Sequence, residues 1–260
     1  MLQIPPIEVT VWIEKLEDRC KYDAASTCSS NISLQDLIEI SLDRQATTDA
    51  LSLNLINLTN GPARGSGSLR TNIAALYPNH TALKENILTT NGGIVGNQVV
   101  LQALLSPKDH VICMYPTYEQ LYQTPTIIGA EVTLWRLDGA NEWALDLDFL
   151  RSSIKANTKM IILNSPNNPT GAYLSRDMQK SIVEVAKEHD LILFCDEVFR
   201  PLFRLDDQNQ VPGSFLELDY ENALVVGSLS KAYSLASVRV GWIASKSSKL
   251  LESRRGGSQR

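Results

Sequence analysis

Strand-like apolar runs alternate with helix-like segments along the chain from residue 87 onward. The runs with the length and composition of buried strands are Ile87–Thr90, His110–Tyr115, Glu131–Leu137, Lys159–Asn164, Leu191–Asp196 and Ala223–Ser228. Between them lie segments with helical apolar periodicity, most clearly Val95–Leu105, Asp146–Ile154 and Ser175–His189. This alternation implies crossover connections, so it predicts a mostly parallel sheet with helices on both faces.

A further apolar run, Arg239–Ser245, follows the strand Ala223–Ser228 too closely for a parallel crossover. The intervening segment, residues 229–238, is shorter than the roughly dozen residues that such a crossover usually needs. We therefore expect this strand to be antiparallel to its neighbour. The predicted fold class is α/β, a three-layer α/β/α domain whose mostly parallel central sheet carries one antiparallel strand.

The chain before the sheet is predicted to be helical. Val9–Asp18 is one helical segment, and Ser33 is the expected N-cap of a second. We divide the chain into an N-terminal helical segment, residues 1–60, and a large domain, residues 61–245. The tail, residues 246–260, loses apolar periodicity and is expected to be disordered.

Composition narrows the class of protein. A net charge of -5 and a pI near 5.3 argue against a nucleic-acid binder, which normally carries a basic face. No apolar run approaches the roughly 18 residues that cross a bilayer, and the first residues lack the features of a secretory signal. The histidines have no metal-ligand spacing, and Cys20, Cys28, Cys113 and Cys195 have no CxxC spacing. We expect a cytoplasmic protein with reduced, buried thiols.

Lys231 stands just after a buried strand, in the segment Gly227-Ser-Leu-Ser-Lys-Ala-Tyr233. In open α/β sheets, ligands bind beside such strand ends. A lysine held there can lose its proton and form an imine with an aldehyde cofactor. Ser228, Ser230 and Arg239 are nearby and suit a phosphate. The combination points to pyridoxal 5′-phosphate.

Asp196 ends the apolar strand Leu191–Asp196. An unpaired carboxylate costs several kcal/mol to bury, so a cationic partner is expected, and a protonated pyridine nitrogen is one. Such pairing keeps the ring an electron sink. An aspartate that only caps a turn is the alternative, which the Lys231 segment makes the weaker interpretation.

Two further strand ends carry candidate ligands of the same cofactor. Asn164–Gly171, with two prolines and a glycine, predicts a rigid turn in which Asn168 presents its amide to the cofactor's 3′-oxygen. Tyr118 also follows a strand and could stack on the pyridine ring. A buried core tyrosine is the simpler interpretation of Tyr118 taken alone.

The segment Thr90–Gly96 follows a strand and opens a helix. Backbone N–H groups at such a helix start favour a phosphate. Glycines that serve only close packing are the alternative for this segment.

The motifs Asn-Ser-Pro-Asn-Asn-Pro-Thr-Gly, Asp-Glu-Val-Phe and Ser-Leu-Ser-Lys-Ala-Tyr, with Arg239, resemble those of fold-type I enzymes of the class I/II aminotransferase family. The resemblance spans roughly residues 30–245. It implies that Lys231 is the catalytic lysine and Asp196 the partner of the pyridinium nitrogen. It also implies further cofactor-binding residues: Gly92, Gly93, Ile94, Tyr118, Asn168, Ser228, Ser230 and Arg239.

The function implied by the resemblance is pyridoxal-phosphate-dependent transfer of an amino group between an amino acid and a 2-oxo acid, typically in a homodimer. Two alternatives stay open. One is β-elimination, including C–S lyase chemistry, which begins with the same loss of a proton to Lys231. The other is a cofactor-binding chain without catalysis.

Three departures from the family pattern motivate the second alternative. Asn60 stands where relatives often have a tyrosine that reaches the phosphate of the neighbouring subunit. Relatives also continue past the last strand into a small C-terminal domain whose arginine binds the substrate carboxylate. After Ser245 this sequence has only a polar tail, so we expect that domain to be absent.

A third departure, Phe199, generates a prediction. The family usually has a tyrosine here that donates a hydrogen bond to the 3′-oxygen, and phenylalanine cannot donate. Because that bond stabilises the deprotonated imine, we expect a raised imine pKa, which a pH titration of the absorbance of the cofactor-loaded protein measures. Phe199→Tyr should lower this pKa, and an unchanged value would contradict the interpretation.

Overall fold

A seven-stranded sheet forms the centre of the molecule. The computed structural model describes residues 6–23, 25–30, 32–52, 60–78, 83–203 and 211–252. In chain order the strands are β1 (Ile87–Thr90), β2 (His110–Tyr115), β3 (Glu131–Arg136), β4 (Thr158–Asn164), β5 (Ile192–Asp196), β6 (Ala223–Ser228) and β7 (Gly241–Ser245). Their order across the sheet is β1-β7-β6-β5-β4-β2-β3.

The sheet has the predicted direction pattern. The neighbours among β2 to β6 pair in parallel, whereas β7 is antiparallel to both of its neighbours, β6 and β1. The prediction of a single antiparallel strand is thereby confirmed. Consequently β1 and the five parallel strands all end at the same edge of the sheet, and β7 begins there.

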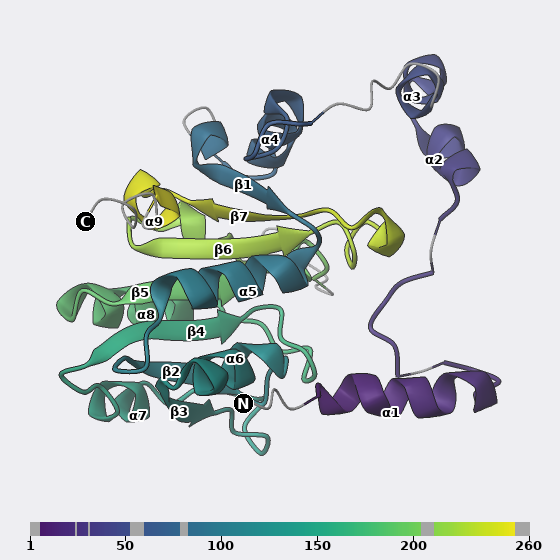
Figure 1. The fold of residues 1–260 in the computed structure, drawn as a ribbon. Coiled ribbons are helices and arrows are strands. Elements are labelled where there is room, and N and C mark those ends of the chain that lie inside the picture. Colours follow the sequence, from purple (N-terminus) through teal and green to yellow (C-terminus); the bar gives the residue numbers. More distant parts are fainter. Residues whose placement is uncertain are drawn as a thin grey trace.

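Helices cover both faces of the sheet, as Figure 1 shows. On one face, α4 (Gly67–Ala74), α7 (Leu147–Ser152) and α8 (Arg176–Glu188) share one buried cluster. On the other, α5 (Gly93–Leu104), α6 (Gln120–Ile128) and α9 (Ser248–Glu252) share a second. Neighbouring strand residues divide between the two clusters, as the alternation of side chains along a strand requires. The three-layer prediction is confirmed.

The four parallel strands in the middle of the sheet, β2, β4, β5 and β6, are largely buried on both faces, whereas the edge strand β3 is partly exposed. In β4, Ile161 and Leu163 belong to the cluster under α8, while Met160 and Ile162 belong to the cluster under α5. This is why each strand appears in the sequence as a continuous apolar run instead of an alternating one.

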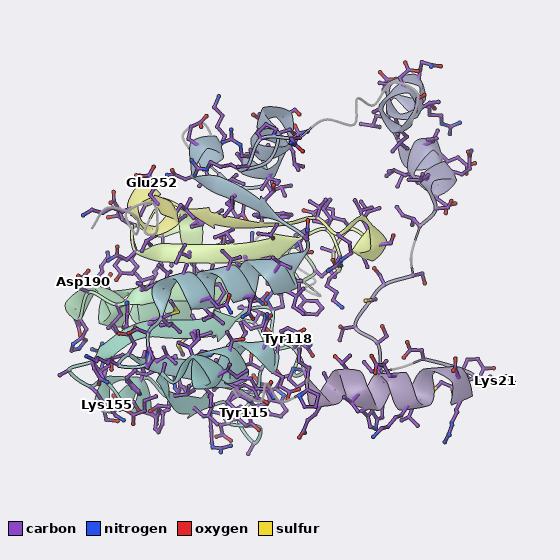
Figure 2. All side chains as sticks on the ribbon, in the orientation of Figure 1. Lys21, Tyr115, Tyr118, Lys155, Asp190 and Glu252 are labelled. Atoms are coloured by element: carbon purple, nitrogen blue, oxygen red, sulfur yellow. The ribbon has the colours of Figure 1, made fainter. Side chains whose placement is uncertain are left out.

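The N-terminal helices stand apart from this body (Figure 1). They are α1 (Glu8–Leu16), α2 (Leu34–Ile40) and α3 (Arg44–Leu51), and none of their described residues is buried. Figure 2 shows their side chains projecting around each helix. Ser33 caps α2, as expected, and accepts a hydrogen bond from the Asp36 backbone N–H. Within the described ranges, no helix is long and apolar enough to cross a membrane.

The start of the last strand and the tail differ from expectation. Arg239 has a left-handed backbone, with φ of 56°, so β7 begins only at Gly241. The prediction of a disordered tail, residues 246–260, is wrong for Ser248–Glu252, which form α9. Leu250 and Leu251 pack on the apolar cluster under α5, which stabilises this helix although it is too short for a clear period. Residues 253–260 lie outside the described part.

The buried His110 at the start of β2 generates a prediction about stability. Its Nδ1 lies 2.7 Å from Thr158 Oγ1 and its Nε2 lies 2.8 Å from Thr133 Oγ1. Burial and the charge of Lys155 lower its pKa. As the pH falls below about 6.5, the unfolded chain takes up a proton that folded His110 resists, so the free energy of unfolding should decrease.

Denaturant unfolding at about pH 7.5 and about pH 5.5 measures this effect. His110→Gln should reduce the difference between the two free energies of unfolding. His189→Gln, which changes an exposed histidine at the end of α8, is the matched control and should keep the wild-type difference. Equal differences in all three proteins would show that His110 does not contribute.

Candidate functional site

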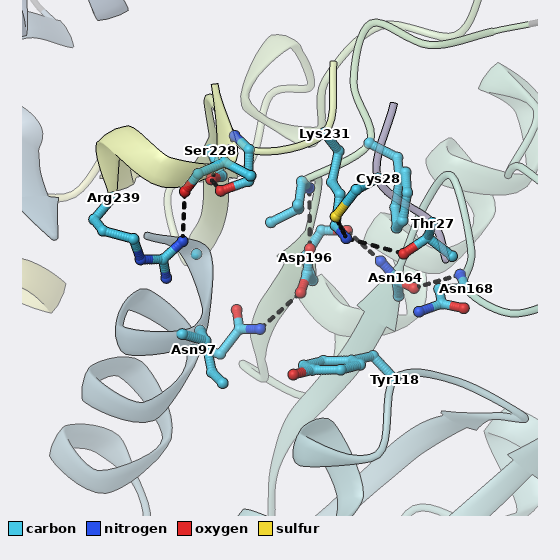
Figure 3. A pocket seen from close by; sticks show the side chains of 16 residues that line it. Thr27, Cys28, Asn97, Tyr118, Asn164, Asn168, Asp196, Ser228, Lys231 and Arg239 are labelled. Atoms are coloured by element: carbon cyan, nitrogen blue, oxygen red, sulfur yellow. Dashed lines mark hydrogen bonds between the residues drawn. The ribbon is translucent and has the colours of Figure 1, made fainter. Parts of the chain in front are cut away.

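A pocket opens at the edge where β1 and the parallel strands end (Figure 3). Its volume is about 260 Å³. All predicted cofactor-binding residues except Gly92 line it: Gly93, Ile94, Tyr118, Asn168, Asp196, Ser228, Ser230, Lys231 and Arg239. They come from separate strand ends and loops, and the topology brings them together. Asn60 is exposed and is not among the residues that line the pocket.

One end of the pocket is built for an anion. Helix α5 begins at Gly93, and no side chain caps its N-terminus. Arg239 lies beside this helix start, with Nη1 donating to the Ala236 carbonyl at 2.9 Å. Ser228 Oγ lies 2.9 Å from Ser230 Oγ, which completes a rim of donors. Free N–H groups at a helix start, a guanidinium and two hydroxyls together suit a phosphate.

Gly92 belongs to this end although it does not line the pocket. Its φ is 83°, and a Cβ there would stand 2.5 Å from Arg239 Nη2. A Cβ on the neighbouring Gly93 would stand 2.6 Å from Val198 Cγ2. The two glycines therefore let the backbone, the arginine and the β5 end approach closely. The same two glycines therefore serve close packing and also form the helix start that suits an anion.

Asp196, at the end of β5, lies buried at the base of the pocket. Its Oδ1 accepts the Val198 N–H at 3.0 Å, and its Oδ2 accepts the Asn97 amide at 2.7 Å. Burial raises the pKa of Asp196, while these two bonds and the charge of Lys231 lower it, and the net direction is upward. Among the described residues no cation lies within ion-pair distance of this carboxylate. The site therefore offers a buried acceptor for a cation.

Lys231 lies at the mouth of the pocket. Its Nζ donates to Thr27 Oγ1 at 2.9 Å and to Cys28 Sγ at 3.1 Å. The same nitrogen lies 5.9 Å from the centre of the Phe199 ring. Ser29 Oγ donates to the Lys231 carbonyl at 3.1 Å. Residues 27–29, which lie between α1 and α2, thus contact the predicted catalytic lysine, and Figure 3 shows Thr27 and Cys28 beside it.

Two asparagines brace the wall formed by the β4 turn. Asn164 Nδ2 donates to the Asp196 carbonyl at 2.9 Å, and Asn164 Oδ1 accepts the Asn168 backbone N–H at 2.8 Å. These bonds fix the backbone of Asn168, whose side chain lines the pocket. Tyr118 lies below Asp196 (Figure 3), and burial together with the Asp196 charge raises its pKa.

Several lining residues were not found from the sequence: Thr27, Cys28, Asn97, Asn164, Val198 and Ala236. Thr27 and Cys28 reach Lys231 across some 200 positions of the chain, so no local pattern marks them. The expectation of buried thiols is confirmed for Cys113 and Cys195 and wrong for Cys20 and Cys28, which are exposed. The latter two lie in the N-terminal segment, whose described residues form no strand and are nowhere buried.

The residues present fit pyridoxal 5′-phosphate. The anion end suits its phosphate, the buried Asp196 carboxylate suits its protonated ring nitrogen, and the Lys231 amine suits its aldehyde. The fit rests on the chemistry of these groups, which line one pocket.

Comparison with known proteins places this geometry in a family. The family model described as "Aminotransferase class I and II" matches residues 33–259. A probable kynurenine–oxoglutarate transaminase of Saccharomyces cerevisiae is 29% identical over 215 residues, which are 78% of this chain and 48% of the relative. A glutamate–pyruvate aminotransferase of Haemophilus influenzae is 32% identical over 161 residues, covering 60% of this chain and 39% of the relative.

A solved structure has the same fold. A PLP-dependent aminotransferase from Streptococcus suis superposes with a TM-score of 0.86 at 36% identity, covering 96% of this chain and 64% of that one. In these matches the chain spans between 39% and 64% of the length of the relative.

The contact between Cys28 and Lys231 generates a prediction. A ligand that occupies the pocket and engages Lys231 should shield Cys28 from iodoacetamide, whereas Cys20 should react as before. Mass spectrometry of the alkylated peptides, with and without pyridoxal 5′-phosphate, should show a several-fold slower reaction at Cys28 only. In Lys231→Ala, pyridoxal 5′-phosphate should shield neither Cys20 nor Cys28. Equal protection of both cysteines in the wild-type chain would contradict the placement of Cys28.

Proposed function

This chain belongs to the class I and II aminotransferase family, and we propose that it is the cofactor-binding part of a pyridoxal-phosphate-dependent transaminase. The observation that carries the proposal is the buried Asp196 carboxylate without a cationic partner among the described residues, in the pocket that Lys231 and Arg239 also line. A buried carboxylate of this kind requires compensation. A cationic ring nitrogen supplies it.

Pyridoxal phosphate, when bound, supplies an aldehyde that links to amines and a ring that accepts electrons. Lys231 is the amine that holds the cofactor and afterwards carries the proton of the substrate α-carbon. Its place at the mouth of the pocket, beside Thr27 and Cys28, supports both roles. The proton can move only if the lysine nitrogen is free of the cofactor at that moment, so the two roles follow in sequence.

The other residues bind and orient. Asp196 would pair with the ring nitrogen, and Asn168 would donate to the 3′-oxygen from a turn that Asn164 braces. Tyr118 supports the ring face. The phosphate is held by Ser228, Ser230, Arg239 and the helix start at Gly92, Gly93 and Ile94. Phe199 adds an apolar wall without a donor.

The proposed reaction moves an amino group between an amino acid and a 2-oxo acid. The names of the relatives from Saccharomyces cerevisiae and Haemophilus influenzae support this substrate class, since both include a 2-oxo acid or its amino partner.

We further propose a cytoplasmic homodimer. Sedimentation of the purified chain tests the dimer, and a monomer at all concentrations would contradict it.

Spectroscopy and product analysis of the 260-residue chain test the proposed function. Purified protein mixed with pyridoxal 5′-phosphate should develop the absorbance of lysine-bound cofactor, and Lys231→Ala should not. Incubation with amino acids should then convert the cofactor to pyridoxamine phosphate with release of a 2-oxo acid. Addition of a second 2-oxo acid should restore the first spectrum.

Other outcomes of this experiment identify the alternatives. Pyruvate and ammonia from a β-substituted amino acid, without pyridoxamine phosphate, would replace the transaminase with a β-lyase. Bound cofactor that no amino acid alters would leave a binding protein without catalysis. Either result would overturn the proposed reaction while keeping the proposed cofactor.

A further inference from the structure

Asn97, on the first turns of α5, is the side-chain partner of Asp196. It is 1% exposed, and its Nδ2 donates to Asp196 Oδ2 at 2.7 Å. The other donor to this carboxylate is the backbone N–H of Val198, on Oδ1. Figure 3 shows Asn97 reaching from the helix toward Asp196 at the base of the pocket.

The orientation of the Asn97 amide follows from its surroundings. In the described part of the chain Asn97 Oδ1 has no hydrogen-bond partner, although it is buried. Turning the amide over would place Oδ1 against the carboxylate, and two acceptors would face each other. The bond to Asp196 therefore fixes Nδ2 toward the carboxylate, and this orientation leaves Oδ1 without a hydrogen bond.

Two glycines make this contact possible. A Cβ at Gly96 would stand 3.0 Å from Val226 Cγ1, and one at Gly93 would stand 2.6 Å from Val198 Cγ2. Positions 93, 96 and 97 are three and four apart, so they share one face of α5, the face toward β5 and β6. Without side chains at 93 and 96, the helix approaches the strands closely enough for the short Asn97 side chain to reach Asp196.

Helix α5 therefore serves both ends of the pocket. Its N-terminus at Gly93 contributes to the anion end, and Asn97, one turn later, holds the carboxylate. The Val198 N–H belongs to the backbone and is present whatever side chain stands there. Among the described residues, Asn97 is the side chain that donates a hydrogen bond to Asp196, and it thereby favours the charged form of this carboxyl group.

We propose that Asn97 is a positioning residue that keeps the buried Asp196 ionised and turned toward the ring nitrogen of the cofactor. The inference deepens the proposed function and rests on it for the identity of the ligand. The hydrogen bond itself is a property of the chain. A hydrogen bond to a buried charged group is among the stronger ones, so its removal has a measurable effect.

Asn97→Leu, which has a similar volume and no donor, tests the proposal. The affinity for pyridoxal 5′-phosphate should fall about ten- to hundredfold. Loss of the donor raises the pKa of Asp196, so the carboxylate should be protonated at a higher pH. The pH at which the affinity for the cofactor falls on acidification should therefore increase by about one unit or more. Asn97→Asp keeps the shape but sets a second carboxylate against Asp196, and its effect should be larger.

Two controls separate this role from a merely structural one. The cofactor analogue with carbon in place of the ring nitrogen has no cation to pair, so Asn97→Leu should hardly change its affinity. In an Asp196→Ala background, Asn97→Leu should cause little further loss of affinity for the natural cofactor. Equal losses for both ligands, or in both backgrounds, would overturn the proposal.

A measurement without cofactor keeps the inference independent of the proposed function. The carboxyl carbon of Asp196, followed by NMR in the cofactor-free protein, should titrate at higher pH in Asn97→Leu than in the wild-type chain. If the wild-type chain binds no pyridoxal phosphate but this shift is seen, the proposed function fails and the role of Asn97 stands. If the cofactor binds and the titration does not move, only the inference about Asn97 fails.

Discussion

The buried carboxylate of Asp196 is the constraint on which the rest of the site depends. A charge at the end of β5 is costly unless donors reach it, and the described chain supplies two, the Val198 N–H and the Asn97 amide. The second requires α5 to lie against the sheet. That closeness in turn requires glycine at positions 93 and 96. The helix, the turn after β5 and the position of the pocket thus follow from one requirement.

Much of this arrangement could be predicted because the central parallel strands, β2, β4, β5 and β6, are largely buried on both faces. A strand of this kind appears as an unbroken apolar run, so its end is visible in the sequence. Polar residues just beyond such ends, among them Asp196, Asn168 and Lys231, were therefore identified as candidates. The topology then brings them to one edge, since the parallel strands end on the same side. The roles assigned to them remain predictions.

The remaining features depend on contacts that no local pattern records. Asn97 looks like any polar residue of a helix start until β5 is placed beside it. Thr27 and Cys28 belong to a segment without apolar period that meets Lys231 only through the fold. Helix α6 contains Pro125, and a proline inside a segment disfavours the prediction of a helix there. Packing against α5 and β3 outweighs that local preference.

The charges of the pocket agree with the chemistry of the ligand as well as with its shape. The charged side chains that line it in the described chain are two cations, Lys231 and Arg239, and one anion, Asp196. The start of α5 adds a partial positive charge. Such a site favours a ligand with a net negative charge that also carries a local positive group for Asp196. A phosphate joined to a protonated pyridine has both. An anion alone would leave Asp196 without a cationic partner, and a cation alone would leave Arg239 and the helix start without an anionic one.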